Sequence, residues 1–190
     1  MFTDRPPLKA RPLAGFLESD RLGSLNLPQD ERLRRLGKSI ESAMNDGTSA
    51  VVRHACAEFL ASAVDFYRVP RLGIRVLAAR PLRVHEGEWA TELFGDYAPD
   101  AMLIRVWMRT AVRKQVTSFG TLLSTLCHEL CHHLDYQQFG FRDSWHTRGF
   151  YERTAALYHH ARGTPPKRLF WVAVAGGRWR IDWPRTNRGI

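Results

Sequence analysis

Apolar residues recur at helical spacing in two segments of the N-terminal third of the chain. The stripe of residues 27–47 consists of Leu33, Leu36, Ile40 and Met44, and that of residues 48–69 consists of Val52, Cys56, Phe59, Leu60 and Ala63. A turn sequence at 45–47 ends the first segment and Pro70 ends the second. We therefore expect a helical hairpin, preceded by an irregular lead-in at 1–27 that is rich in proline and glycine.

Alternating polarity predicts strands in two later segments. Residues 72–84 and 101–112 each contain such a run, and we interpret the intervening residues 85–100 as a loop or hairpin arm. Near the C-terminal end, aromatic-rich arms within 168–183 flank an Ala-Gly-Gly turn. This pattern predicts a β-hairpin.

The strongest helical pattern covers residues 117–139. Its leucines recur every four residues, at Leu122, Leu126, Leu130 and Leu134. Thr117 or Ser118 can cap the start of this helix, and Gly140 follows its end. Helices and strands together predict an α+β fold with a small mixed sheet.

A further helix is expected at residues 146–162, with Asp143 or Ser144 as its cap. The length of 190 residues suits one compact domain. We expect three parts within it, namely the lead-in and helical hairpin at 1–70, a central unit at 71–162 and a β-hairpin tail at 163–190.

The net charge of +9 is unevenly distributed, because residues 39–161 are neutral and residues 162–190 carry +6. Such a basic tail can contact DNA or merely confer solubility. The chain has no apolar run of membrane-spanning length and no signal-peptide pattern, so we expect a cytoplasmic protein without a membrane segment. Two of the three cysteines lie four apart in one expected helix, which argues against a disulfide framework.

The sequence "CHELCHHLDY" at 127–136 carries the clearest chemical signal. His128 and His132 are four apart on one helix, so both imidazoles can reach a single zinc ion. Glu129 would sit beside that ion without binding it, where its carboxylate can take a proton from water. This is the arrangement of the H-E-x-x-H motif.

A catalytic zinc site needs a third protein ligand and an open fourth position. His146 and Glu152 are the candidates on the following helix, where about 120° separates them, so both should not bind one ion. We favour His146 because it shares its helix face with Phe150 and Leu157, which look core-facing.

Other residues in and near this segment are not interpreted as metal ligands. His133 points about 100° away from the two ligand histidines and is interpreted as a polar surface residue. Cys127 and Cys131 are interpreted as small core residues. Asp135 and Asp143 could orient a ligand imidazole or serve as helix-surface and cap residues.

The sequence "HELCHHLDY", followed by "HTRGF" at 146–150, resembles the SprT-like family of zinc metallopeptidases. The resemblance covers about residues 72–162. It implies a zincin-like domain in which His128, His132 and His146 bind Zn²⁺ and Glu129 is the catalytic base. The implied function is hydrolysis of peptide bonds in a protein or peptide substrate.

In zincins an edge strand pairs with extended substrate, and residues 103–110 are the candidate strand here. An oxyanion would also need a donor, for which the sequence offers Tyr151, Arg148, His159 and His160 without choosing among them. Many SprT-like proteins end in a four-cysteine zinc ribbon, which this chain lacks. An alternative function, suggested by the basic tail, is a nucleic-acid-associated protein with a structural or inactive zinc site.

Overall fold

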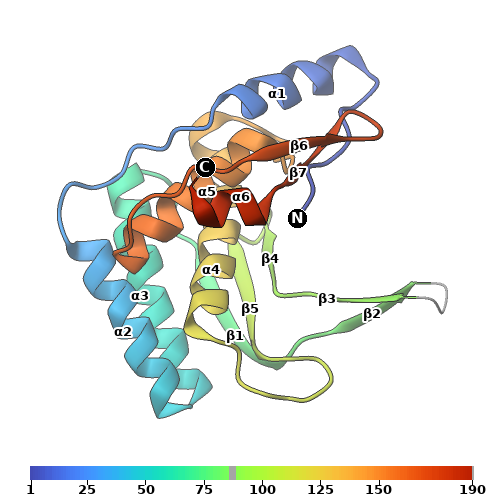
Figure 1. Ribbon diagram of the computed structural model, residues 1–190. Helices are drawn as coiled ribbons and strands as arrows, with labels where there is room; N and C mark the ends of the chain where they lie inside the picture. The colour runs from blue at the N-terminus through green and yellow to red at the C-terminus, as the bar shows by residue number, and fades with distance from the viewer. Residues whose placement is uncertain (86–88, 190) are drawn as a thin grey trace.

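A computed structural model describes residues 1–85 and 89–189 of the chain. The fold is α+β, as predicted, with helices packed against one side of a small mixed sheet (Figure 1). The helices are α1 (Ala10–Arg21), α2 (Arg32–Asp46), α3 (Ser49–Tyr67), α4 (Phe119–Leu134), α5 (Arg148–Arg162) and α6 (Trp183–Arg188). None of the described helices has the length and apolar character that crossing a membrane requires.

The mixed sheet has the strand order β1-β5-β4. The strand β1 (Gly73–Ala79) runs parallel to β5 (Leu103–Arg109), and β4 (Gly95–Ala98) runs antiparallel to β5 on its other side. Both Ile104 and Val106 are fully buried, as side chains of a central strand on the core face should be.

The prediction that residues 103–110 form an edge strand is therefore wrong, because β5 has a partner on each side. Among the described strands the edges of this sheet are β1 and β4, and β4 lies in a segment that the sequence predicted only as a loop or hairpin arm. The order of strands depends on pairing between segments remote in sequence, so alternation along β5 could not reveal it.

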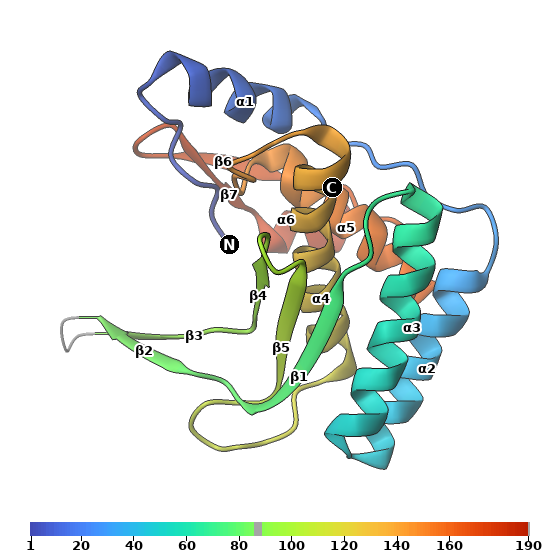
Figure 2. The same cartoon turned by 180° about the vertical axis from the view of Figure 1, so that it is seen from behind.

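The strands β2 (Leu82–His85) and β3 (Trp89–Glu92) form a separate antiparallel arm. This arm projects away from the helices in both views (Figures 1 and 2). A loop or hairpin arm was expected for residues 85–100, and the arm and β4 together occupy that segment.

The predicted hairpin of α2 and α3 is present, and α3 packs beside β1 (Figure 2). The helix α4 lies against β4 and β5, and α5 packs on both α4 and α2. One hydrophobic cluster includes Phe59 of α3, Ile104 of β5, Leu126 of α4, Leu157 of α5 and Ile181 near the C-terminal end. The three expected parts of the chain therefore share one core.

The helix α1 contradicts the prediction of an irregular lead-in at 1–27. It rests on the N-terminal end of α5 and buries only Phe16 and Ser19. Two buried positions make too narrow a stripe to show in the sequence, and Pro12 and Gly15 further obscure the helical pattern.

The C-terminal β-hairpin was predicted and is present. Its strands β6 (Trp171–Val174) and β7 (Arg178–Ile181) are joined by a turn in which Gly176 and Gly177 have φ angles of 76° and 69°. Glycine is the residue that adopts such angles without steric cost. Residues near the N-terminus extend this hairpin, since the Thr3 amide donates to the Trp179 carbonyl at 2.8 Å.

Two side-chain caps mark the starts of α4 and α5, near which the candidate metal ligands lie. The Ser118 hydroxyl accepts from the Thr121 amide and caps α4, as predicted. Thr147 caps α5 by accepting from the Phe150 amide, so the prediction of Asp143 or Ser144 as that cap is wrong. His146 therefore lies one residue before the cap and not on the helix itself.

Candidate metal centre

Three histidines converge between α4 and α5. His128 and His132 lie one turn apart on α4, and His146 approaches them from the loop before α5. The Nε2 atom of His128 is 3.1 Å from Nε2 of His146 and 3.2 Å from Nε2 of His132. One ligand atom from each of the three residues lies within 4.8 Å of the others, so the cluster could hold a metal ion.

These separations fit a tetrahedral zinc site. Zinc–nitrogen bonds of about 2.0–2.1 Å at tetrahedral angles place neighbouring ligand nitrogens about 3.3 Å apart. The lone pairs of neutral imidazoles that face one another repel. A bound cation would replace this repulsion by attraction. Burial keeps the rings of His128 and His132 neutral, lowering the pKa of His128 to about 3 and that of His132 well below its usual value.

The Nδ1 atom of His146 is 3.2 Å from Oδ2 of Asp4. The same carboxylate oxygen accepts from the His146 backbone amide at 2.9 Å. Because a carboxylate only accepts, Nδ1 carries the ring proton and Nε2 is free to bind a cation. Asp4 therefore orients the third histidine in the manner of carboxylate–histidine–zinc sites.

His132 is oriented by a hydroxyl relay. Its Nδ1 lies 2.7 Å from Oγ of Ser144, which donates in turn to Oδ2 of Asp135 at 3.0 Å. Since the hydroxyl proton goes to the carboxylate, the Ser144 oxygen accepts the Nδ1 proton of His132. Asp135 thus orients a ligand imidazole, one of the two predicted roles, although it does so through Ser144.

Asp135 also forms a buried ion pair with Arg153 of α5, at 2.7 Å. Both side chains are almost completely inaccessible to solvent. The Arg153 guanidinium donates further to the carbonyl oxygens of Ser19 and Leu22, at and just beyond the end of α1. The helix α1 is therefore tied to the same network that orients His132.

A second set of polar contacts joins α1 to the loop that carries His146. The Arg148 backbone amide donates to the Asp20 carboxylate at 2.9 Å, and the Arg148 guanidinium pairs with the same group. Ser19 and Thr147 hydroxyls lie 3.0 Å apart. These contacts fix the start of α5, and His146 immediately precedes it.

Glu129 is 5% exposed and does not belong to the group of potential metal ligands. Burial, and secondarily the Asp96 carboxylate, raise the pKa of Glu129 to about 8. A divalent cation at the His cluster would act in the opposite direction. Gly95 of β4 lies so close that a Cβ atom there would be 3.0 Å from Oε1 of Glu129 and 2.5 Å from Cγ2 of Thr125.

Two cavities meet at this centre. Both are lined by His128 and Glu129, and the shallower one, of about 520 Å³, also reaches His132 and His146. The histidine cluster and the adjacent carboxylate are therefore accessible to a ligand. Tyr97 of β4 lines the shallower cavity, which places this edge strand of the sheet beside the cluster.

Glu152, the rival third ligand, lies outside the cluster. Its carboxylate accepts from Nε1 of Trp171 at 3.1 Å. His146 is the residue that the fold brings to His128 and His132, as the sequence favoured. Asp143 is exposed, while Cys127 and Cys131 are buried free thiols, as predicted for core residues.

The prediction of a surface position for His133 is wrong, because this side chain is fully buried. Its Nε2 donates to the Pro70 carbonyl at 2.8 Å, and its Nδ1 accepts from the Tyr97 hydroxyl at 2.8 Å. His133 therefore joins α4 to the chain before β1 and to β4. A helical wheel gives the direction of a side chain but not what packs there.

The four candidate oxyanion donors lie at different distances from the cluster. The ring of Tyr151 stacks on His146 with centroids 5.9 Å apart, and its hydroxyl donates to the Phe2 carbonyl at 3.1 Å. Arg148 is paired with Asp20, and His159 and His160 lie two turns further along α5. Tyr151 is thus the one whose ring contacts the cluster.

Sequence reasoning missed Asp4 and Ser144. Asp4 is 142 positions from His146, so no local pattern connects the two. Ser144 was considered only as a helix cap. Comparison of the chain with protein-family models, curated proteins and solved structures finds no match.

Proposed function

We propose that this protein is a zinc-dependent metallopeptidase. The observation that carries the proposal is the convergence of three histidine Nε2 atoms beside a carboxylate that is not a ligand, at a place that a cavity reaches. Structural zinc sites are usually closed by four protein ligands. Among the described residues, the group of potential ligands has three members, which leaves a position for a substrate or water.

The donor set supports zinc as the ion, with His128, His132 and His146 as its ligands. Three neutral imidazole nitrogens at these separations are the donor set of several catalytic zinc sites. Bound zinc would supply a Lewis acid that polarises a carbonyl and lowers the pKa of a water molecule. The hydrogen bonds of Asp4 and Ser144 would hold two of the rings in the required tautomer.

Glu129 is the proposed general base. It would accept the proton of the attacking water and pass it to the leaving amine. Its burial beside the cavity, next to the first ligand, supports this role. Gly95 of β4 lies next to its carboxyl group, since a Cβ atom there would be 3.0 Å from Oε1.

The free edge of β4 is the proposed binding strand for an extended peptide. It replaces residues 103–110 in this role, because β5 is fully paired. Strand addition at an exposed sheet edge satisfies the main-chain groups of a peptide regardless of its sequence. The residues of β4 and its flanks line both cavities, so a peptide paired there would cross the histidine cluster.

A zincin fold and SprT-like membership belong to the same proposal. The support is the motif helix α4 beneath a small mixed sheet, with the third histidine returned from the next helix, and the spacing of "HELCHHLDY" and "HTRGF".

The test combines metal analysis with a cleavage assay. We expect about one zinc per purified chain and cleavage of an unfolded protein such as casein. Glu129→Gln should retain zinc and lose cleavage, whereas the matched control Glu58→Gln, on the exposed face of α3, should retain both. Cleavage that persists in Glu129→Gln would remove this residue as the base.

A second candidate is a nucleic-acid-binding protein with an inactive zinc site. It is favoured by exposed cations near the C-terminal end, where the guanidinium groups of Arg168 and Arg185 lie 5.3 and 4.7 Å from the ring centre of Phe170. Removing residues 164–190 would not test it, because Leu169 and Ile181 belong to the core. Replacing both arginines by glutamine should instead weaken DNA binding at low salt; absence of binding by the unaltered chain would exclude this candidate.

A further inference from the structure

The larger of the two cavities, of about 970 Å³, extends away from the metal centre along α4 and α5. Starting from His128 and Glu129, it follows α4 back to Ser118 and α5 forward to Arg162. Much of its surface is apolar, and residues of the segment from Thr164 to Asn187 also line it. The cavity therefore connects the proposed catalytic groups with the first turn of α4.

The end of the cavity remote from the histidines is basic. Arg162, Lys167 and His159 line it. Arg162 donates to the Tyr158 hydroxyl and its guanidinium lies 5.9 Å from the ring centre of Phe119. Lys167 donates to the Asn187 side-chain oxygen at 3.1 Å. Both cations are thus held in place by neutral groups.

No carboxylate of the described residues forms an ion pair with Arg162 or Lys167. The cavity lining contains two carboxylates, Glu92 and Glu129. Glu92 is paired with Arg80 and also accepts from the Ala111 amide, and Glu129 lies at the opposite end beside His128. The basic end therefore has a surplus of positive charge, to which the N-terminal dipole of α4 adds.

The other side of the metal centre has the opposite character. The shallower cavity is lined by Asp4, Asp96 and Asp143, of which Asp96 is paired with Arg105, and no lysine or arginine lines it among the described residues. A peptide that crosses the histidine cluster would therefore meet positive charge on one side only. This charge difference would distinguish between the two orientations in which a peptide could bind in the cleft.

The length of α4 sets the distance between the basic end of the cavity and the end at His128. From Gly120 to His128 the helix rises by about 12 Å, at 1.5 Å per residue. An extended peptide covers this distance in about four residues, at about 3.3 Å per residue.

We propose that this cavity is a substrate subsite for an acidic side chain about four residues from the scissile bond, on one side of it. The inference rests on the proposed peptidase function. The apolar walls of the cavity would accommodate the intervening side chains, and Arg162 and Lys167 would bind the carboxylate. The positive net charge of the whole chain would also favour the approach of acidic substrates.

Binding of fluorescein-labelled peptides to the full-length Glu129→Gln variant, measured by fluorescence anisotropy with zinc present, tests the subsite without cleavage. Peptides of one sequence carry Glu, Gln or Lys at each position in turn. We expect Glu to bind about tenfold more tightly than Lys at positions on one side only, with the difference lost at high salt.

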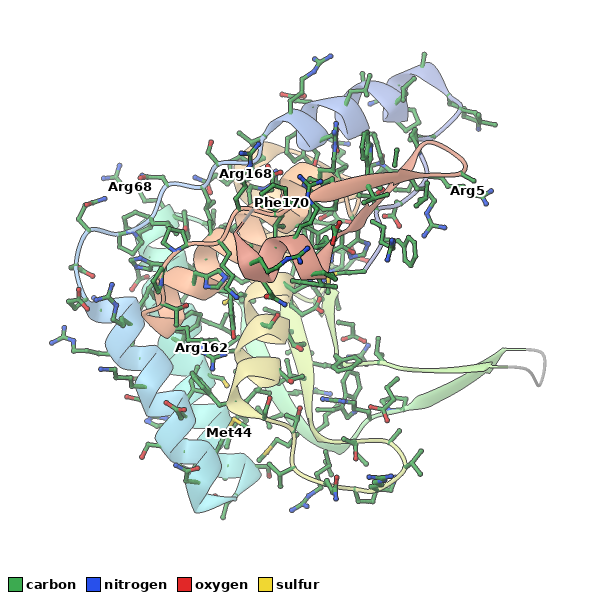
Figure 3. The ribbon with its side chains drawn as sticks, in the orientation of Figure 1. Arg5, Met44, Arg68, Arg162, Arg168 and Phe170 are labelled. Carbon is green, nitrogen blue, oxygen red and sulfur yellow. The ribbon has the colours of Figure 1, made fainter. Side chains whose placement is uncertain are left out.

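Arg162→Gln combined with Lys167→Gln, in the same background, should abolish the preference. Arg68→Gln is the matched control, because Arg68 is an exposed cation at the end of α3 that does not line the cavity and lies well apart from Arg162 in Figure 3. Thermal melting and zinc content check that each variant folds.

Equal affinity for the Glu and Lys peptides, no measurable binding of any peptide, or a preference that survives in the double variant would overturn the subsite. Cleavage by the unaltered chain is measured separately. If it cuts no peptide while the charge preference in binding persists, the peptidase proposal fails and the acidic-peptide site remains.

Discussion

Asp4 accepts hydrogen bonds from both the backbone amide and the ring of His146, at 2.9 and 3.2 Å. A residue near the N-terminus thus orients the third histidine of a cluster that otherwise comes from the region of α4 and α5. The carboxylate fixes the tautomer and position of the His146 ring. Removing the carboxylate should therefore weaken metal binding, in addition to any effect on the fold.

The first prediction concerns this carboxylate. Asp4→Ala should weaken zinc binding by about 10–100-fold, as loss of a carboxylate behind a ligand histidine typically does. Competition with a chromogenic chelator measures the affinity. Asp4→Asn should retain part of it, because the amide oxygen still accepts a hydrogen bond. Asp65→Ala, at an exposed position of α3, is the control, and equal affinities in all four proteins would contradict the assignment.

Metal content distinguishes the two candidates for third ligand. His146→Ala should purify with little zinc, whereas Glu152→Ala should retain it, because the Glu152 carboxylate bonds to Trp171. Inductively coupled plasma spectrometry on the purified variants provides the measurement. Full zinc in His146→Ala would show that the cluster in the structure is not the binding site.

The close approach of β4 to α4 predicts an effect of Gly95. A valine there would contact Glu129 and Thr125 and displace the carboxylate. Cleavage should fall by about 100-fold, since displacements near 1 Å have such effects on catalysis, while zinc content is unchanged. Gly15→Ala is the control, because a Cβ atom at Gly15 meets nothing within 4 Å. Wild-type cleavage by Gly95→Val would mean that Glu129 tolerates displacement.

The buried pair of Asp135 and Arg153 predicts a large stability effect. Arg153→Met should lower the free energy of unfolding by about 3–5 kcal/mol, because it leaves Asp135 buried without a counter-charge. Urea denaturation measures the change. Arg105→Met removes a pair with Asp96 that lies at the surface and is screened by solvent, so its effect should be much smaller. Similar effects of the two variants would argue against a special role of burial.

The three cysteines should not react in the folded protein. Burial raises the pKa of Cys56 and of Cys131 to about 12 and also raises that of Cys127. Because the thiolate is the reactive form, labelling with a thiol reagent near neutral pH should be very slow, and all three should react in denaturant. Rapid labelling of the native chain would show that α3 or α4 opens.

The sequence predicted the helices α2 to α5 because each carries an apolar stripe wide enough to show at helical period. It also predicted His128, His132 and His146 together, since two lie one turn apart and the third had one rival on the next helix. Spacing along a helix is a local property and sufficed for His128 and His132. His146 was favoured on an assumed helix face, although it precedes α5 in the structure.

The remaining features depend on contacts between remote segments. His133 is buried because Pro70 and Tyr97 meet it, and neither contact is visible from α4 alone. The same limitation explains the wrong assignment of β5 as the edge strand. Asp4 could not be assigned, because its position depends on the pairing of residues 1–3 with the C-terminal hairpin.

That pairing has a consequence for biosynthesis. The Thr3 amide bonds to the carbonyl of Trp179, and the Met1 carbonyl accepts from the Ile181 amide. A nascent chain on the ribosome contains Asp4 well before it contains these partners, which follow about 175 residues later in the sequence. Contacts of such sequence separation form late in folding. A chain stalled before residue 178 should therefore hold zinc only weakly.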